Sequence, residues 1–121
     1  MTLRYDSTAE FDKDLKRLSK RYRTLSQDLE TLKRNAIELL HLQHIDNHAC
    51  LAIPGCVIEG VSAYKVKKFA CRSLKGKGAQ SGIRITYIYF STENRILFVE
   101  MYYKGDQENE NRQRIIDYLK L

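Results

Sequence analysis

Basic side chains concentrate in one part of this sequence, and their type and spacing favour chemistry on phosphate groups. The chain has 121 residues and a formal net charge of +6, yet residues 60–92 contain no Asp or Glu. The remaining residues hold nearly equal numbers of basic and acidic side chains, so this stretch carries the excess charge. A cationic surface this dense is typical of proteins that bind phosphates. The basic residues of the stretch are Lys65, Lys67, Lys68, Arg72, Lys75, Lys77 and Arg84.

The alternation of basic and apolar side chains along the chain predicts that several of these cations share one face of a sheet. Lys65 and Lys67 alternate with apolar neighbours, Arg84 lies on the next apolar run, and Lys104 ends the run after that. If these strands are consecutive and antiparallel, Lys65, Lys67 and Arg84 lie on the face away from the helices. Cations with little acid nearby repel one another, so a partly buried lysine among them could act as a general base. Its neighbours could offset charge on a pentavalent phosphate, and the alternative is an ordinary solvated strand face.

Tyrosines are interleaved with the cations, which suits the binding of unpaired RNA bases by stacking. Tyr87 and Tyr89 are in phase with apolar residues, so we expect them in the core. Tyr102 and Tyr103 stand beside Lys104 at a strand end and are better placed for function. Tyr64 precedes Lys65 and is a further candidate for RNA contact.

A group of histidines and cysteines raises the question of a metal site. His41, His44, His48, Cys50 and Cys56 lie close together in sequence, but no CxxC spacing accompanies them. Histidines at a helix C-terminus also interact favourably with the helix dipole, so we predict no metal. The glycine-rich motifs of nucleotide-binding proteins are missing from the sequence, and we predict no cofactor.

Periodicity predicts an α+β domain that spans residues 1–121. Apolar residues spaced four and three apart from Phe11 to Leu39 indicate a helical hairpin, although one extended coiled helix would show the same pattern. Ser7 and Glu10 form a capping box that predicts the start of the first helix, and Pro54-Gly55 marks a loop over 44–58. The expected elements are a strand at 2–5, helices at 8–21 and 26–42, strands at 64–67, 83–90 and 95–103, a hairpin turn at 91–94, and a helix at 109–119.

Composition favours a cytoplasmic protein that is not in a membrane. The N-terminus has no apolar signal segment, and no apolar run approaches the roughly 18 residues of a membrane span. Three cysteines are an odd number for a disulfide framework and fit a reducing compartment.

Five segments of the sequence, in this order, resemble the RelE/ParE toxin superfamily of type II toxin–antitoxin systems. They are FDKDLKRL at 11–18, YKVK at 64–67, SGIRITY at 81–87, YYKGD at 102–106 and NENR at 109–112. The resemblance covers nearly the whole chain and implies a β-α-α-β-β-β-α fold, with an antiparallel sheet packed against a helical hairpin and a C-terminal helix. It further implies a metal-free endoribonuclease of the RelE-like branch, which cuts mRNA on the ribosome and is silenced by a cognate antitoxin.

Residue roles carried over from the resemblance fall on the cationic strands. In such enzymes the RNA 2′-hydroxyl attacks its own phosphate, and cations replace the histidine pair of ordinary ribonucleases. The implied catalytic residues are Lys65, Lys67, Arg84, Lys104 and Tyr103. The implied RNA-binding residues are Tyr64, Lys68, Arg72, Lys75, Lys77 and Tyr102, some of which would grip ribosomal RNA. Gly105-Asp106 stands where the family commonly has an arginine, so the general acid is left unassigned.

Two other functions compete with this one. The ParE side of the superfamily poisons DNA gyrase and cuts no RNA; the Lys65, Lys67 and Arg84 set favours the ribonuclease side. A non-catalytic double-stranded RNA-binding domain has a similar α-β-β-β-α order. Such domains place lysines at the start of the last helix, where this chain has the acidic run DQENE at 106–110.

Overall fold

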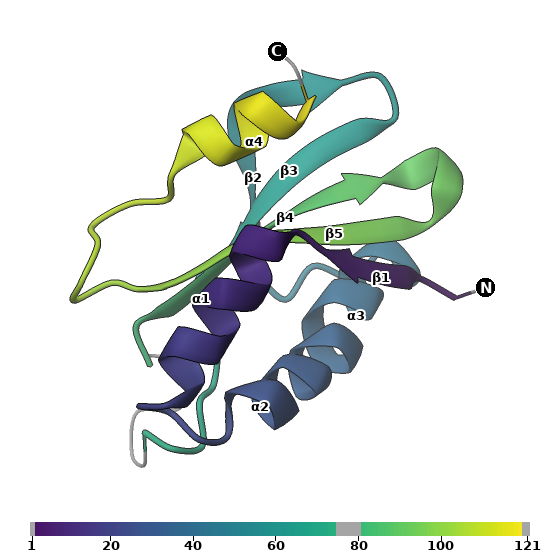
Figure 1. The fold of residues 1–121 in the computed structure, drawn as a ribbon. Coiled ribbons are helices and arrows are strands. Elements are labelled where there is room, and N and C mark those ends of the chain that lie inside the picture. The colour runs from purple at the N-terminus through teal and green to yellow at the C-terminus, as the bar shows by residue number, and fades with distance from the viewer. Residues whose placement is uncertain (1, 75–80, 120–121) are drawn as a thin grey trace.

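The computed structural model describes residues 2–74 and 81–119, apart from the side chains of Cys56 and Val57, and shows a mixed five-stranded sheet with helices on both faces (Figure 1). Lys75 and Lys77 therefore lie outside the described residues. The strands are β1 (Arg4–Ser7), β2 (Cys50–Ile58), β3 (Val61–Val66), β4 (Ile83–Phe90) and β5 (Arg95–Tyr103). The helices are α1 (Ala9–Ser19), α2 (Leu25–Leu32), α3 (Glu38–His41) and α4 (Arg112–Leu119), with a π-helical turn (Lys33–Ile37) joining α2 to α3.

The helical hairpin predicted from the apolar spacing is confirmed. α1 begins at Ala9, and the second helix runs from Leu25 through the π-helical turn to His41. The predicted cap is off by one residue: Thr8 accepts the amide of Phe11, whereas the Ser7 hydroxyl donates to Asp12. Thr8 can do this because its backbone is extended while the next residue is helical, which is the conformation of an N-cap.

The sheet order is β1-β5-β4-β3-β2, with β1 parallel to β5 and every other pair antiparallel. The expected antiparallel pairing is confirmed for β2 to β5, whereas the opening strand joins the outer side of β5 and is parallel to it. The expected loop over 44–58 is wrong in its second half, where β2 forms an edge strand. Pro54 is tolerated at an edge, and the register shift between Ala52 and Val57 accommodates Gly55 at φ +79°.

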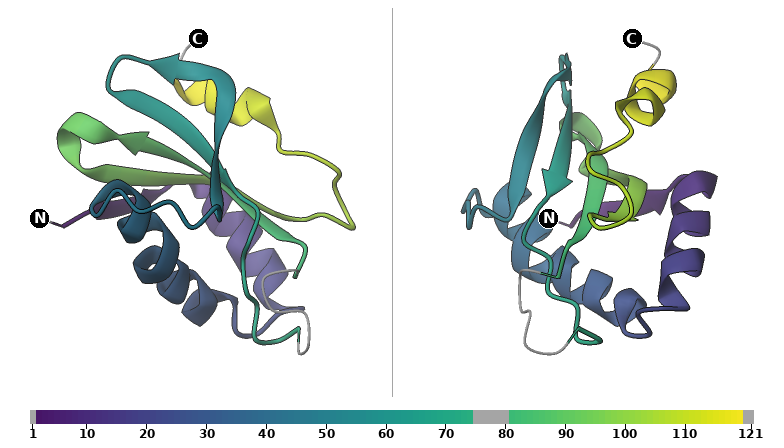
Figure 2. Two further views of the ribbon diagram at one scale, coloured as in Figure 1. Left: turned by 180° about the vertical axis from the view of Figure 1, so that it is seen from behind. Right: turned by 90° about the vertical axis from the view of Figure 1, so that its left-hand side faces the viewer.

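Apolar side chains on the two faces of the sheet form separate clusters. On one face, Phe11 and Leu25 from the helical hairpin pack against Ile85, Tyr87 and other strand residues, as the phase of Tyr87 predicted. On the other face, Ile115 of α4 packs with residues that include Ile53 and Ile88. Figures 1 and 2 show α4 on the opposite side of the sheet from the α2–α3 helix.

α4 begins later than the sequence predicted, at Arg112 rather than at residue 109. Asn111 is the reason, because its side chain accepts the amide of Gln113 and so caps the helix. The residues before it are used to bind the sheet, as described below. The hairpin turn between β4 and β5 is confirmed as a 3₁₀ turn (Ser91–Glu93) followed by Asn94 in the left-handed conformation.

Candidate functional site

Pairing between strands places the predicted cations in neighbouring rows on the α4 face of the sheet. Lys65 of β3 pairs with Thr86 of β4, and Thr86 pairs with Glu100 of β5. Two residues away on the same strands, Arg84 of β4 pairs with Tyr102 of β5. These residues alternate with side chains that the helical hairpin covers, so they lie on the opposite face, as the sequence predicted for Lys65 and Arg84.

The cationic strands surround a small cavity of about 130 Å³, which we call the cationic pocket. Arg84 is fixed there by hydrogen bonds from its guanidinium to the carbonyls of Lys67 (3.1 Å) and Ile83 (3.4 Å). The structure therefore brings together four of the five predicted catalytic residues and one predicted RNA-binding tyrosine. The pocket is lined by Lys65, Lys67, Arg84, Tyr102, Lys104, Glu108 and Asn109.

Tyr102 is the buried aromatic wall of the cationic pocket. Burial raises the pKa of its phenol to about 12, the carboxylates of Glu110 and Glu100 act in the same direction, and Arg84 opposes them. The phenol is therefore protonated at neutral pH and can donate a hydrogen bond. Such a donor beside Arg84 suits an anionic oxygen.

An acidic side chain from a distant part of the sequence lies beside these cations. The expectation that few acidic side chains lie near them is therefore wrong. The Nζ of Lys65 lies 2.9 Å from Oε2 of Glu110, and the side chains are only 17% and 7% exposed. Burial alone would raise the pKa of the Glu110 carboxyl. The hydrogen bond from Lys65, the charge of Lys65 and that of Arg112 outweigh burial and hold this pKa below its usual value. Lys65 and Lys67 also line a second cavity of about 180 Å³, on the β2 side of Glu110.

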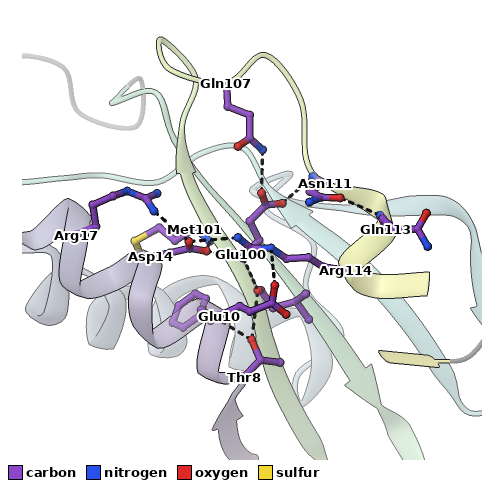
Figure 3. Close-up of polar contacts among 12 residues, drawn as sticks. Thr8, Glu10, Asp14, Arg17, Glu100, Met101, Gln107, Asn111, Gln113 and Arg114 are labelled. Carbon is purple, nitrogen blue, oxygen red and sulfur yellow. Dashed lines mark hydrogen bonds and ion pairs between the residues drawn. The ribbon is translucent and has the colours of Figure 1, made fainter. Parts of the chain in front are cut away.

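Buried carboxylates hold the segment that carries Glu110 in place (Figure 3). Glu100 is 2% exposed and accepts hydrogen bonds from the side chain of Gln107 and the amide of Asn111, each at 2.8 Å. Asp14 of α1 is 3% exposed and accepts a hydrogen bond from Arg114 of α4 at 2.7 Å. The 107–111 segment and α4 are therefore tied to β5 and α1 at separate points.

Sequence reasoning missed Asp14, Glu100 and Glu110. For Asp14 a signal was present, because it lies three residues after Phe11 and four before Leu18, on the apolar face of α1. Glu100 interrupts the apolar run of β5 and so also marks a buried charge. Glu110 has no comparable signal, since its partner depends on where the chain folds back after β5.

Tyr103, predicted as catalytic, points to the other face of the sheet. Its ring packs 5.9 Å from the ring of Tyr22, and the guanidinium of Arg21 lies 5.4 Å from its centroid. Gly82 and Gly105 approach the same ring so closely that a Cβ on either would overlap it. The structure therefore does not bring Tyr103 to the cationic pocket, and its contacts are those of a packing residue.

The other predicted RNA-binding residues that the structure describes lie apart from the pocket. Tyr64 stacks on Tyr87 at 5.4 Å under the helical hairpin. Arg72 is held by Asp28, which accepts from its Nε at 3.0 Å. Lys68 is exposed beside a groove of about 260 Å³ next to α2.

His41 is enclosed by aromatic side chains. Its Nε2 lies 2.8 Å from the hydroxyl of Tyr87, and its ring packs against Tyr64 and Tyr89. Burial, and secondarily His44, lowers the pKa of His41 to about 4. Among the described side chains, which do not include that of Cys56, no three His, Cys, Asp or Glu are arranged to hold a metal ion. None of the helices in the described part of the chain is both long and apolar enough to cross a bilayer.

Comparison with known proteins gives a likeness in fold only. No family model matches the sequence, and no curated protein matches it. A chain in the crystal structure of the archaeal RelE–RelB complex from Pyrococcus horikoshii OT3 aligns with a TM-score of 0.51 and 15% identity, over 87% of this chain and 98% of that chain. An arginine mutant of the E. coli toxin RelE in the free state aligns with a TM-score of 0.49 and 18% identity, over 89% of this chain and 90% of that chain. The protein has a RelE-like α+β fold.

Proposed function

We propose that this protein is the toxin of a type II toxin–antitoxin system and an endoribonuclease that cuts mRNA on the ribosome. The observation that carries this proposal is the cationic pocket, where Lys65, Lys67, Arg84 and Lys104 meet beside Tyr102. The RelE-like fold supports it. The proposed partners are mRNA, ribosomal RNA and a cognate antitoxin, which places the protein in the cytoplasm.

The proposed reaction is transesterification within the RNA strand and uses no metal ion. The 2′-oxygen bonds to the adjacent phosphorus as the bond from phosphorus to the 5′-oxygen breaks, which leaves a 2′,3′-cyclic phosphate and a 5′-hydroxyl. The 2′-hydroxyl loses its proton to a base, and the 5′-oxygen gains one. Lys65 either takes up the proton or orients the phosphate, and the general acid is unassigned.

Electrostatic stabilisation is the main contribution that the pocket can make. Negative charge grows on the phosphoryl oxygens in the transition state, and preorganised cations offset it without reorganising. Arg84 is preorganised by its bonds to backbone carbonyls, and Tyr102 adds a protonated phenol. Lys67 and Lys104 are exposed and suited to hold the flanking backbone.

The test is cleavage of ribosome-bound message in a cell-free translation reaction with purified protein. The wild type is expected to arrest translation and leave cut mRNA ends, and Arg84→Ala to cleave at least about 100-fold more slowly. Lys13→Ala on the exposed face of α1 removes the same charge far from the pocket and serves as the matched control. Intact message together with poisoned DNA gyrase would establish the competing function instead, and full activity in Arg84→Ala would show that the site is wrongly placed.

A further inference from the structure

The pair between Lys65 and Glu110 lies at the edge of the cationic pocket, because Lys65 lines that pocket and both residues line the second cavity. Lys65 is proposed to take up a proton or to orient the phosphate, yet its Nζ is engaged at 2.9 Å by a carboxylate that is 7% exposed. Arg112 lies 3.7 Å from the other oxygen of Glu110. Glu110 thus presents two anionic oxygens to two cations, as a phosphate would.

The 107–111 segment that carries Glu110 is attached to the sheet by few and polar contacts. Gln107 and Asn111 bond to Glu100, while residues 107–109 are exposed. Ile115, inside α4, belongs to the apolar cluster on this face of the sheet. The segment can therefore lift from Glu100 and Lys65 by breaking hydrogen bonds that water or a ligand replaces, while the apolar contact of Ile115 stays in place.

Beneath this segment lies a polar group that the described residues leave unpaired. Thr86 is 1% exposed and pairs across the strands with Lys65 and Glu100. Its hydroxyl has no hydrogen-bond partner among the described residues. A buried hydroxyl without a partner destabilises the fold, so its presence beside Lys65 calls for a reason. A ligand oxygen bound at Lys65 would supply that partner.

We propose that Glu110 occupies the position of an RNA phosphate on Lys65, so that the 107–111 segment is a cover that the substrate displaces. This inference rests on the proposed function for the identity of the substrate. Displacement exposes Lys65 and Thr86 together and extends the cationic pocket toward the second cavity. A catalytic base is the other role open to Glu110, and the two roles predict opposite effects of removing its charge.

The affinity experiment measures binding of a single-stranded DNA of about 12 nucleotides, which lacks the 2′-hydroxyl and is not cut. Glu110→Gln keeps the shape and a hydrogen-bond acceptor for Lys65 but removes the competing charge, so its Kd is expected to fall about tenfold at fixed salt. Glu59→Gln makes the same charge change on an exposed side chain in the turn between β2 and β3, outside the lining of both cavities, and is expected to lower Kd less than threefold. Equal effects in the two variants would overturn the proposal, as would a Kd unchanged in Glu110→Gln.

A second measurement follows the cover itself by amide hydrogen exchange. The Asn111 amide donates to Glu100 at 2.8 Å, so DNA binding should speed its exchange in the wild type. Slower or unchanged exchange would overturn the proposal.

RNA cleavage by Glu110→Gln, measured separately, should equal or exceed wild type, and a large loss would make Glu110 the base instead. Tighter DNA binding with no RNA cleavage by any variant would refute the ribonuclease and leave the cover standing.

Discussion

The ion pair between Asp14 and Arg114 offers a quantitative test of how α4 is fixed to the rest of the fold. Asp14 accepts from Arg114 at 2.7 Å and from the amide of Met101 at 3.1 Å, and Arg17 lies 3.5 Å away (Figure 3). Arg114→Met keeps the aliphatic stem and removes the charge. Asp14→Asn keeps the shape of the other partner, so the two substitutions and their combination form a double-mutant cycle.

The expected energies follow from the burial of each partner. Breaking a fully buried pair by removing one member costs about 3–5 kcal/mol, because the other charge is left uncompensated. Asp14 is buried but retains Met101 and Arg17, and the side chain of Arg114 is 21% exposed. We therefore expect each single variant to lose about 2–3 kcal/mol of unfolding free energy, and the pair to show a coupling of about 1–2 kcal/mol.

Urea denaturation at pH 7, followed by circular dichroism, measures these free energies if the slopes with urea stay equal. The double variant should be about 1–2 kcal/mol more stable than the sum of the single losses predicts. Strict additivity would refute the reasoning, because it would mean that the two charges contribute independently. A single loss below about 0.5 kcal/mol would show that solvent replaces the pair as it does at an exposed site.

Two further predictions concern buried groups on opposite faces of the sheet. His41 has a pKa of about 4 in the folded chain and about 6.5 when unfolded, so the unfolded state binds the extra proton between these values and stability falls on acidification across that window. Wild type should lose about 3 kcal/mol more than His41→Gln between pH 7 and 4, and parallel losses in urea midpoints would contradict this. Thr86→Val, which removes the unpaired hydroxyl, should raise the unfolding free energy by about 1 kcal/mol while weakening DNA binding. A destabilised variant would show that this hydroxyl is satisfied in the native protein.

The elements that could be predicted from the sequence are those whose side chains repeat with one clear period. Apolar spacing was enough for α1 and the helix after it, and alternation was enough for β4 and β5. β2 was not predicted because Pro54 and Gly55 usually indicate a loop. An edge strand with a register shift accommodates both residues. The parallel pairing of β1 with β5 could not be read from the sequence either, since strand order is set by contacts between segments far apart in the chain.

The same distinction separates the predicted from the missed parts of the site. Lys65 and Arg84 were placed on a common face because each alternates with apolar neighbours on its own strand. Their partner Glu110 is 45 residues from Lys65, and nothing local to either residue specifies the contact. Tyr102 and Tyr103 are adjacent, so one had to point away from the cations, and only the pairing of β5 decides which one.

The composition of the α4 face bears on whether this surface exists for stability or for function. Half of it is apolar, where Ile88 and Ile115 stabilise the fold by burial. The other half buries Glu100 and Thr86 and holds the largely buried pair of Lys65 and Glu110, although apolar residues of similar volume in place of a buried ion pair are often neutral or stabilising. A surface shaped by stability alone would extend the apolar half. The charged and unpaired polar groups next to the cationic pocket therefore favour an anionic ligand on this half, and in the proposal above Glu110 offsets part of their cost while that ligand is absent.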